Sequence, residues 1–166
     1  QKIQILYPSS IKELKNIINF CKKKGKTFAI RTGECSYDSK SIALEKNGMI
    51  ISLKKLNKII RINKKDKLML VESGAKISDL IYFLKKKNLT LYSVPGGEHI
   101  SVGGAISANV IGKDSSKLFA SFGDSIKSIK IISYNGNIKK LYNNSKEFFN
   151  YIGSFGMFGI ILEANI

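Results

Sequence analysis

The chain has 166 residues, of which 43% are hydrophobic, so it is long enough to form one domain with its own core. Its 28 Lys and Arg residues outnumber 12 Asp and Glu residues, which gives a formal net charge of +16. No apolar run approaches the roughly 20 residues that a membrane-spanning helix needs. The two cysteines are too few for a disulfide framework, and this low cysteine count favours a cytoplasmic setting.

The positive charge is almost entirely lysine, since Arg31 and Arg61 are the only arginines. Recognition of bases and phosphates favours the two-pronged guanidinium of arginine, so we expect no nucleic-acid partner. A solvated surface is the simplest interpretation of the lysines. Peripheral association with the acidic inner face of a membrane, or attraction of an anionic substrate, is the alternative.

The first predicted element is a helix that begins at Ser10, with Glu13 in capping-box spacing, and ends at Gly25. Further helices are predicted at 77–87 and 145–151. Apolar runs predict strands at 27–31, 49–53, 58–62, 67–72, 89–94, 126–134, 137–142 and 159–166. Asn135-Gly136 is the signal of a two-residue hairpin turn. Strands and helices mixed without regular βαβ alternation predict an α+β fold, in a single domain over residues 1–166.

The segment 95–113 reads PGGEHISVGGAISANVIGK and concentrates five glycines among small residues. Glycine lets another group approach the backbone closely. Bare backbone N–H groups in such turns form a nest suited to a phosphate or diphosphate. A pair of tight turns flanking a short buried helix is the alternative interpretation.

Several site chemistries are excluded by spacing. The glycines within 153–159 are spaced G-x-x-G-x-x-G, which is not a dinucleotide fingerprint. The sequence around Gly112-Lys113 lacks the leading glycine and the following Ser or Thr of a P-loop. One histidine, His99, and two cysteines cannot supply a four-ligand zinc site, and no nucleophile motif accompanies the histidine. The chemistry is therefore expected from a bound cofactor.

Motifs along the whole chain then form an ordered set. They are PSSIKEL at 8–14, IRTGECSY at 30–37, IISLKKLN at 50–57 with VESGA at 71–75, SVGGAI at 101–106, GK at 112–113 with SFGD at 121–124, and GSFGMFGI at 153–160. In this order they resemble the FAD-binding domain of the vanillyl-alcohol oxidase / p-cresol methylhydroxylase (PCMH-type) flavoprotein family. Within that family the chain looks most similar to the decaprenylphosphoryl-ribose oxidase-like sugar oxidases.

The resemblance implies two small mixed subdomains with FAD between them, its diphosphate over the loops 31–37 and 96–104. The cofactor-binding residues that it implies are Arg31, Thr32, Gly33, Glu34, Cys35, Ser36, Tyr37, Pro95, Gly96, Gly97, Glu98, His99, Ile100, Ser101, Gly103, Gly104, Ala105, Ala108, Ile111, Gly112, Gly156, Gly159 and Ile160. Tyr37 and Lys113 are the candidates for catalytic contact.

The resemblance also implies a reaction. Relatives oxidise a CH–OH group of a sugar-like, polyol or lipid-linked sugar substrate by hydride transfer to FAD. They carry a C-terminal substrate-capping domain, which we expect to lie outside this chain, so that the chain alone is expected to be poorly active.

The sequence departs from the family pattern at four positions. Thr32 and Glu34 stand where relatives commonly have glycine, and Glu34 brings a negative charge to the diphosphate loop. Cys35 stands where many relatives have the histidine that links FAD covalently, so we expect non-covalent FAD. Ile111 replaces a histidine of the decaprenylphosphoryl-ribose subgroup, which indicates a different substrate.

Two other functions stay open from the sequence alone. One is a flavoenzyme similar to UDP-N-acetylenolpyruvylglucosamine reductase, which shares the FAD fold and is reduced by NADPH. The other is a basic module for nucleic acid or acidic membranes that has lost FAD, which the net charge and the departures at Thr32 and Glu34 favour.

Overall fold

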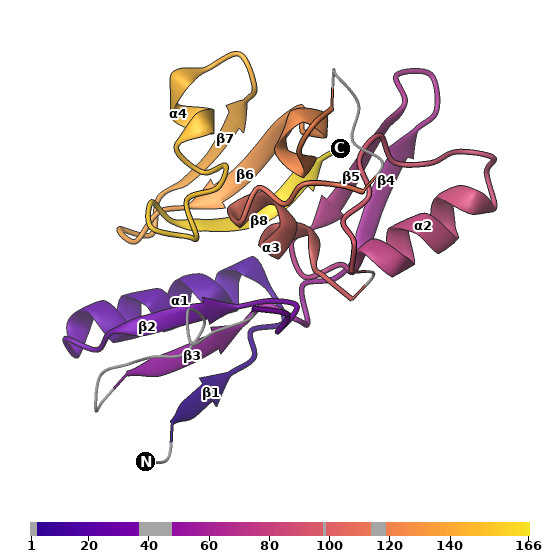
Figure 1. Cartoon of the computed structure of the whole chain (residues 1–166). Coiled ribbons are helices and arrows are strands. Elements are labelled where there is room, and N and C mark those ends of the chain that lie inside the picture. Colours follow the sequence, from indigo (N-terminus) through magenta and orange to yellow (C-terminus); the bar gives the residue numbers. More distant parts are fainter. Residues whose placement is uncertain (1–2, 37–47, 98, 114–118) are drawn as a thin grey trace.

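The computed structural model of the chain describes residues 3–36, 48–97, 99–113 and 119–166. The described residues form two lobes (Figure 1). The N-terminal lobe, residues 3–53, holds a three-stranded sheet, and the C-terminal lobe, residues 59–166, holds a five-stranded sheet. A parallel and an antiparallel sheet with interspersed helices confirm the predicted α+β class.

The N-terminal lobe comprises β1 (Gln4–Leu6), α1 (Ile11–Lys23), β2 (Phe28–Arg31) and β3 (Met49–Ser52). β3 lies between β1 and β2, and both pairs are parallel. The Oγ of Ser10 accepts the Glu13 N–H at 3.2 Å, as predicted. The Glu13 carboxylate accepts the N–H of Ser9 at 2.7 Å, one residue earlier than in a standard capping box, and the Oγ of Ser9 at 2.9 Å, and these two hydrogen bonds from Ser9 lower the pKa of Glu13. Gly25, at φ 59°, ends the helix.

The C-terminal lobe is antiparallel, with the strand order β4-β5-β8-β6-β7. Its strands are β4 (Ile59–Asn63), β5 (Leu68–Glu72), β6 (Ser128–Ile132), β7 (Ile138–Tyr142) and β8 (Ile160–Asn165). Its helices are α2 (Ile77–Lys85), α3 (Val102–Ser107), the short 3-10 helix η2 (Phe122–Ser125) and α4 (Lys146–Phe149). Apolar residues of α2, α3, β5, β6 and β8 form one buried cluster. β8 is the last strand in the sequence, and the strand order places it at the centre of the sheet.

A second buried cluster joins the two lobes. Leu14 and Ile18 of α1 pack with Ile132 of β6 and with Ile160 and Leu162 of β8, and each of these side chains is at most 2% exposed. In Figure 1, α1 lies between the two sheets. Because burying apolar surface stabilises by about 25 cal/mol per Å², this shared core holds the lobes in one relative position.

Two sequence-based expectations about local structure are wrong. The segment 89–94 buries Leu91 and Ser93 in alternation, as a strand would, but its backbone is irregular, and the bridge between Pro95 and Gly112 comes only after it. The hairpin between β6 and β7 has a three-residue loop, since the Ser133 N–H donates to the Asn137 carbonyl at 2.9 Å. Gly136, at φ 81°, closes that loop.

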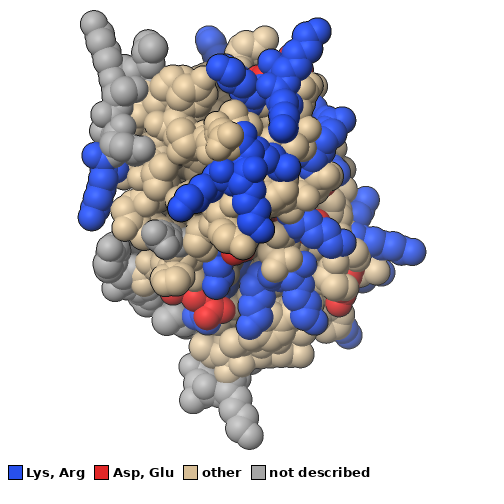
Figure 2. All heavy atoms as spheres, turned by 90° about the vertical axis from the view of Figure 1, so that its right-hand side faces the viewer, with Lys and Arg blue, Asp and Glu red and all other residues tan. Residues whose placement is uncertain are grey.

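The surface is strongly basic on one side. The side that carries α2, β4 and β5 faces the viewer in Figure 2, and Lys and Arg side chains spread over it with few acidic ones between them. None of the helices in the described part of the chain is long and apolar enough to cross a membrane.

Candidate functional site

A cavity of about 280 Å³ lies where the two lobes meet. Three segments far apart in the sequence line it: residues 30–36 at the end of β2 and in the loop after it, residues 100–110 around α3, and residues 155–161 in the turn before β8 and at its start. Ligand sites commonly measure about 300–1,000 Å³ and are mostly apolar with a few polar groups. The cavity is close to the small end of that range, and glycines and short polar side chains form much of its wall.

The loop after β2 approaches α3 at a glycine. An ideal Cβ on Gly33 would lie 2.7 Å from the backbone nitrogen of Ser101 and 3.2 Å from the carbonyl oxygen of His99. No side chain fits there, so the close contact between the loop and α3 requires glycine at this position. Among the described residues, no hydrogen bond uses the backbone N–H groups of residues 33–36.

Arg31 and Glu34 add charge to the same wall. Arg31 Nη1 lies 3.9 Å from Glu34 Oε1, and the buried Nε of Arg31 has no hydrogen-bond partner among the described residues. Glu34 has φ 58°, the left-handed conformation that non-glycine residues rarely adopt. Glu34 therefore adopts a conformation that favours glycine at this position. Thr32, by contrast, does not need positive φ.

The N-terminus of α3 forms the adjoining wall. Ser101 is the N-cap, and its Oγ accepts the Gly104 N–H at 3.3 Å. Gly103 packs directly on Ser73, where a Cβ would meet the Ser73 Cβ at 2.8 Å. The short buried helix that the sequence allowed therefore exists, and it also lines the cavity.

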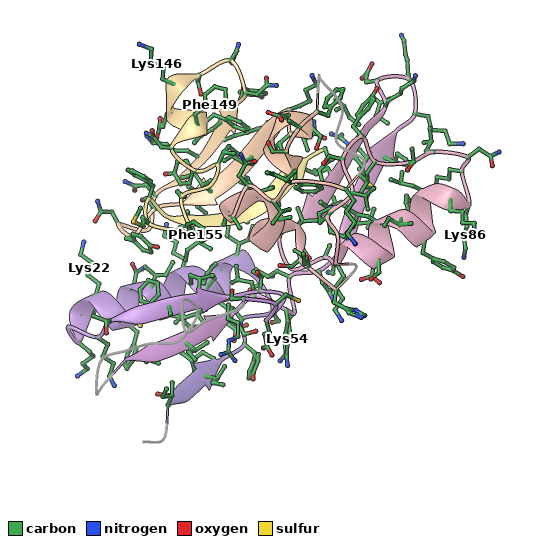
Figure 3. The ribbon with its side chains drawn as sticks, viewed as in Figure 1. Lys22, Lys54, Lys86, Lys146, Phe149 and Phe155 are labelled. Carbon is green, nitrogen blue, oxygen red and sulfur yellow. The ribbon has the colours of Figure 1, made fainter. Side chains whose placement is uncertain are left out.

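The third wall is the turn 153–159, in which Gly153, Gly156 and Gly159 all have positive φ. The Tyr134 hydroxyl donates to the Gly156 carbonyl, and the Tyr134 ring contacts the edge of Phe28 at 5.7 Å between centroids. Burial raises the pKa of Tyr134. In Figure 3, Phe155 lies on the side of the C-terminal lobe that faces α1.

The structure brings most of the predicted binding residues to the cavity. Those that line it are Arg31, Thr32, Gly33, Glu34, Cys35, Ser36, Ile100, Ser101, Gly103, Gly104, Ala108, Gly156, Gly159 and Ile160. The sequence analysis missed six other lining residues, namely Ile30, Leu53, Ser107, Val110, Phe155 and Ile161. All but one had a signal in the sequence, because they lie inside the segments singled out there: Ile30 in 30–37, Leu53 in 50–57, Ser107 and Val110 in 95–113, and Phe155 in 153–160. Ile161 directly follows the last of these segments.

Other predicted residues lie elsewhere. Pro95, Gly96, Gly97 and His99 precede the cavity wall, Ala105 is fully buried in the core, and Ile111 and Gly112 form isolated bridges to Ser121 and Pro95. The Lys113 side chain covers Gly96, since its Cε would lie 3.0 Å from a Cβ there. Tyr37 and Glu98 fall outside the described residues.

Two lobes whose glycine-rich segments meet at one cavity define a domain built to hold a nucleotide-like cofactor. Residues 3–142 match the model of the FAD binding domain family. The chain therefore belongs to the FAD binding domain family, whose cofactor is FAD, and the PCMH-type resemblance is confirmed.

Characterised proteins support the same family. The chain is 30% identical over 122 residues to decaprenylphosphoryl-beta-D-ribose oxidase of Mycolicibacterium smegmatis, a match that covers 72% of the chain and 26% of that protein. It is 31% identical over 126 residues to D-lactate dehydrogenase of Anaerostipes hadrus, with 72% and 26% covered. The chain thus spans about a quarter of these relatives.

A solved structure of alkyldihydroxyacetonephosphate synthase superposes with a TM-score of 0.85 over 97% of the chain and 31% of that protein, at 20% identity. This match covers both lobes, so the two-lobed fold is shared with part of that protein.

The residues at the cavity fit FAD. Gly33 and Gly104 let the loop after β2 pack closely on α3 beside the cavity, since a Cβ on Gly104 would lie 3.1 Å from the Ser101 Oγ and 3.4 Å from the Thr32 Oγ1. The unpartnered Nε of Arg31 is a donor suited to a phosphate oxygen. Together with the backbone N–H groups of residues 33–36, which no other described residue accepts, it supplies the donors that a diphosphate needs.

Proposed function

We propose that this chain is the FAD-binding part of a flavin-dependent oxidoreductase that oxidises a CH–OH group of a sugar-like or polyol substrate. The observation that carries the proposal is the meeting of three glycine-rich segments at one cavity in a chain of the FAD binding domain family. The names of two relatives, a ribose oxidase and a lactate dehydrogenase, both include a hydroxyl-bearing compound. When bound, FAD supplies the acceptor for the hydride that leaves the carbinol carbon.

The residues of this chain bind and orient the cofactor. Backbone N–H groups of 33–36, together with the Arg31 guanidinium, would hold the diphosphate from one side. The start of α3 at Ser101 and Gly104, which touches this loop at Gly33, would line the adjoining wall. The turn 153–160 would lie at the adenosine end.

FAD is proposed to be non-covalent. Cys35 is exposed at the cavity, and its Sγ donates to the Gly33 carbonyl at 3.1 Å. Acid precipitation separates the two forms of attachment. Yellow colour in the supernatant supports non-covalent FAD, whereas colour in the pellet that disappears in the variant Cys35→Ser would contradict it.

A separate C-terminal domain is proposed to cover the substrate, since the relatives are about four times as long as their match to this chain.

Ile111 lies in the loop that follows α3, and its side chain is 73% exposed. Its place in the subgroup pattern supports a substrate different from that of the decaprenylphosphoryl-ribose oxidases.

The reaction class is tested by mixing the FAD-loaded protein with a panel of sugars, polyols and D-lactate under anaerobic conditions, and in parallel with NADPH. Bleaching of the flavin by an alcohol supports the proposal, even at a slow rate. Bleaching by NADPH alone would contradict it and favour the reductase alternative.

Peripheral membrane association in the cytoplasm is a further part of the proposal. The basic side that carries α2, β4 and β5 supports it (Figure 2), because each Lys or Arg near an anionic bilayer contributes about 1 kcal/mol. Co-sedimentation with anionic vesicles but not with neutral ones is expected. Equal recovery with both, or tighter binding to duplex DNA, would contradict it.

A further inference from the structure

Arg31 and Glu34 line the same cavity but form only a long ion pair with each other. The 3.9 Å between Arg31 Nη1 and Glu34 Oε1 exceeds the roughly 2.7–2.9 Å of a charge-assisted hydrogen bond. The Nε of Arg31 is buried without a partner among the described residues. The guanidinium therefore keeps donors that Glu34 does not use, and both residues line the cavity.

The backbone brings the carboxylate of Glu34 to this position. Glu34 has φ 58°, in the left-handed region that favours glycine. Its side chain is 47% exposed, while that of Arg31 is 22% exposed. Of these two cavity-lining residues, Glu34 is thus the more exposed to solvent, into which its side chain can turn, and Arg31 is the more buried.

We propose that Glu34 sets the affinity of the cavity for the cofactor by competing with the diphosphate for Arg31. The proposal rests on the proposed function, since it takes the diphosphate of FAD to lie at this wall. A diphosphate that binds the Arg31 guanidinium must displace the Glu34 carboxylate from it, and the lost attraction between these two opposite charges is a cost of binding. Glu34 therefore lowers the affinity for a diphosphate ligand, and its removal raises it.

Two variants separate charge from backbone strain. Glu34→Gln removes the charge and keeps the side-chain length and the positive φ, whereas Glu34→Gly removes the charge and the strain together. Asp79→Asn is the control, because Asp79 is an exposed acid on α2 that does not line the cavity. Calorimetric titration of each purified chain with FAD, and separately with ADP, measures binding of ligands that share the diphosphate.

For Glu34→Gln we expect Kd to fall about five- to tenfold for both ligands, and for Glu34→Gly at least as much. Asp79→Asn leaves Kd within about twofold. Arg31→Gln raises Kd about tenfold, and in that background Glu34→Gln changes Kd by less than about twofold, because the two residues act on one another. Circular dichroism melting checks that each variant is folded.

The titrations distinguish a failure of the Glu34 competition from a failure of the proposed FAD-binding function. If the wild-type chain binds FAD and Glu34→Gln leaves Kd unchanged or raises it, the competition is overturned while the FAD-binding function stands. If every folded variant, wild type included, fails to bind FAD, the proposed function and the competition are both overturned.

Discussion

A Cβ atom on Gly33 would lie 2.7 Å from the backbone nitrogen of Ser101 and 3.2 Å from the Ser101 Oγ. These two residues belong to different lobes and stand 68 positions apart in sequence (101 − 33). Their contact is the point at which the loop after β2 closes on α3. It defines one side of the cavity.

The first prediction concerns this contact. Gly33→Ala forces the loop and α3 apart, so we expect a loss of about 1–3 kcal/mol in the free energy of unfolding and a rise in the Kd for FAD of at least about tenfold. Thermal melting and calorimetric titration measure the two effects. Gly25→Ala is the matched control, because nothing lies within 4 Å of its Cβ position and only its positive φ is strained. A Gly33→Ala protein that binds FAD as tightly as Gly25→Ala would contradict the prediction.

A second prediction compares two helix caps. Ser101 and Ser10 each accept a backbone N–H at the start of a helix, so Ser101→Ala and Ser10→Ala are both expected to cost about 1 kcal/mol of stability. Only Ser101 lines the cavity. FAD affinity should therefore fall about fivefold in Ser101→Ala and stay unchanged in Ser10→Ala. Equal effects of the two variants on Kd would show that the α3 cap has no role in binding.

The third prediction concerns Tyr134, which ties the turn 153–159 to the N-terminal lobe. Tyr134→Phe keeps the ring against Phe28 but removes the hydroxyl that donates to the Gly156 carbonyl. We expect a loss of about 0.5–1.5 kcal/mol in stability and weaker FAD binding. Tyr142→Phe on β7, exposed and outside the cavity, is the control and should change neither quantity.

Alkaline pH provides a fourth prediction. Burial raises the pKa of Tyr134 in the folded chain above its ordinary value of about 10. The unfolded chain therefore loses the Tyr134 hydroxyl proton at a lower pH than the folded chain does. The contribution of Tyr134 to the free energy of unfolding is complete below about pH 10 and is lost as the pH rises through the pKa of the folded chain. The melting temperature should fall more steeply above that pH in the wild type than in Tyr134→Phe. Parallel falls would mean that Tyr134 does not contribute.

The sequence predicted most of the segments that line the cavity, because glycine is needed where two backbone segments approach closely. The segments around Gly33, Gly104 and Gly156 were predicted to bind a cofactor, and the structure brings all three to one cavity. The helix from Ser10 to Gly25 was also predictable, since its cap, its apolar stripe and its terminal glycine agree.

Other features depend on contacts that no local pattern encodes. β1 has only three residues and exists because it pairs with β3. The segment 89–94 has the alternation of a strand but no neighbouring strand among the described residues. The orientation of Glu34 toward Arg31 follows from a positive φ that the residue type disfavours. Local propensity therefore could not give it.

The most direct test of the central claim, that the cavity between the lobes binds FAD, is the visible absorbance spectrum of the purified chain, followed by titration with FAD. We predict flavin absorption bands in the protein as purified or after reconstitution, with one FAD per chain and loss of binding in Gly33→Ala. A folded chain that has no flavin absorption and takes up no FAD would contradict it.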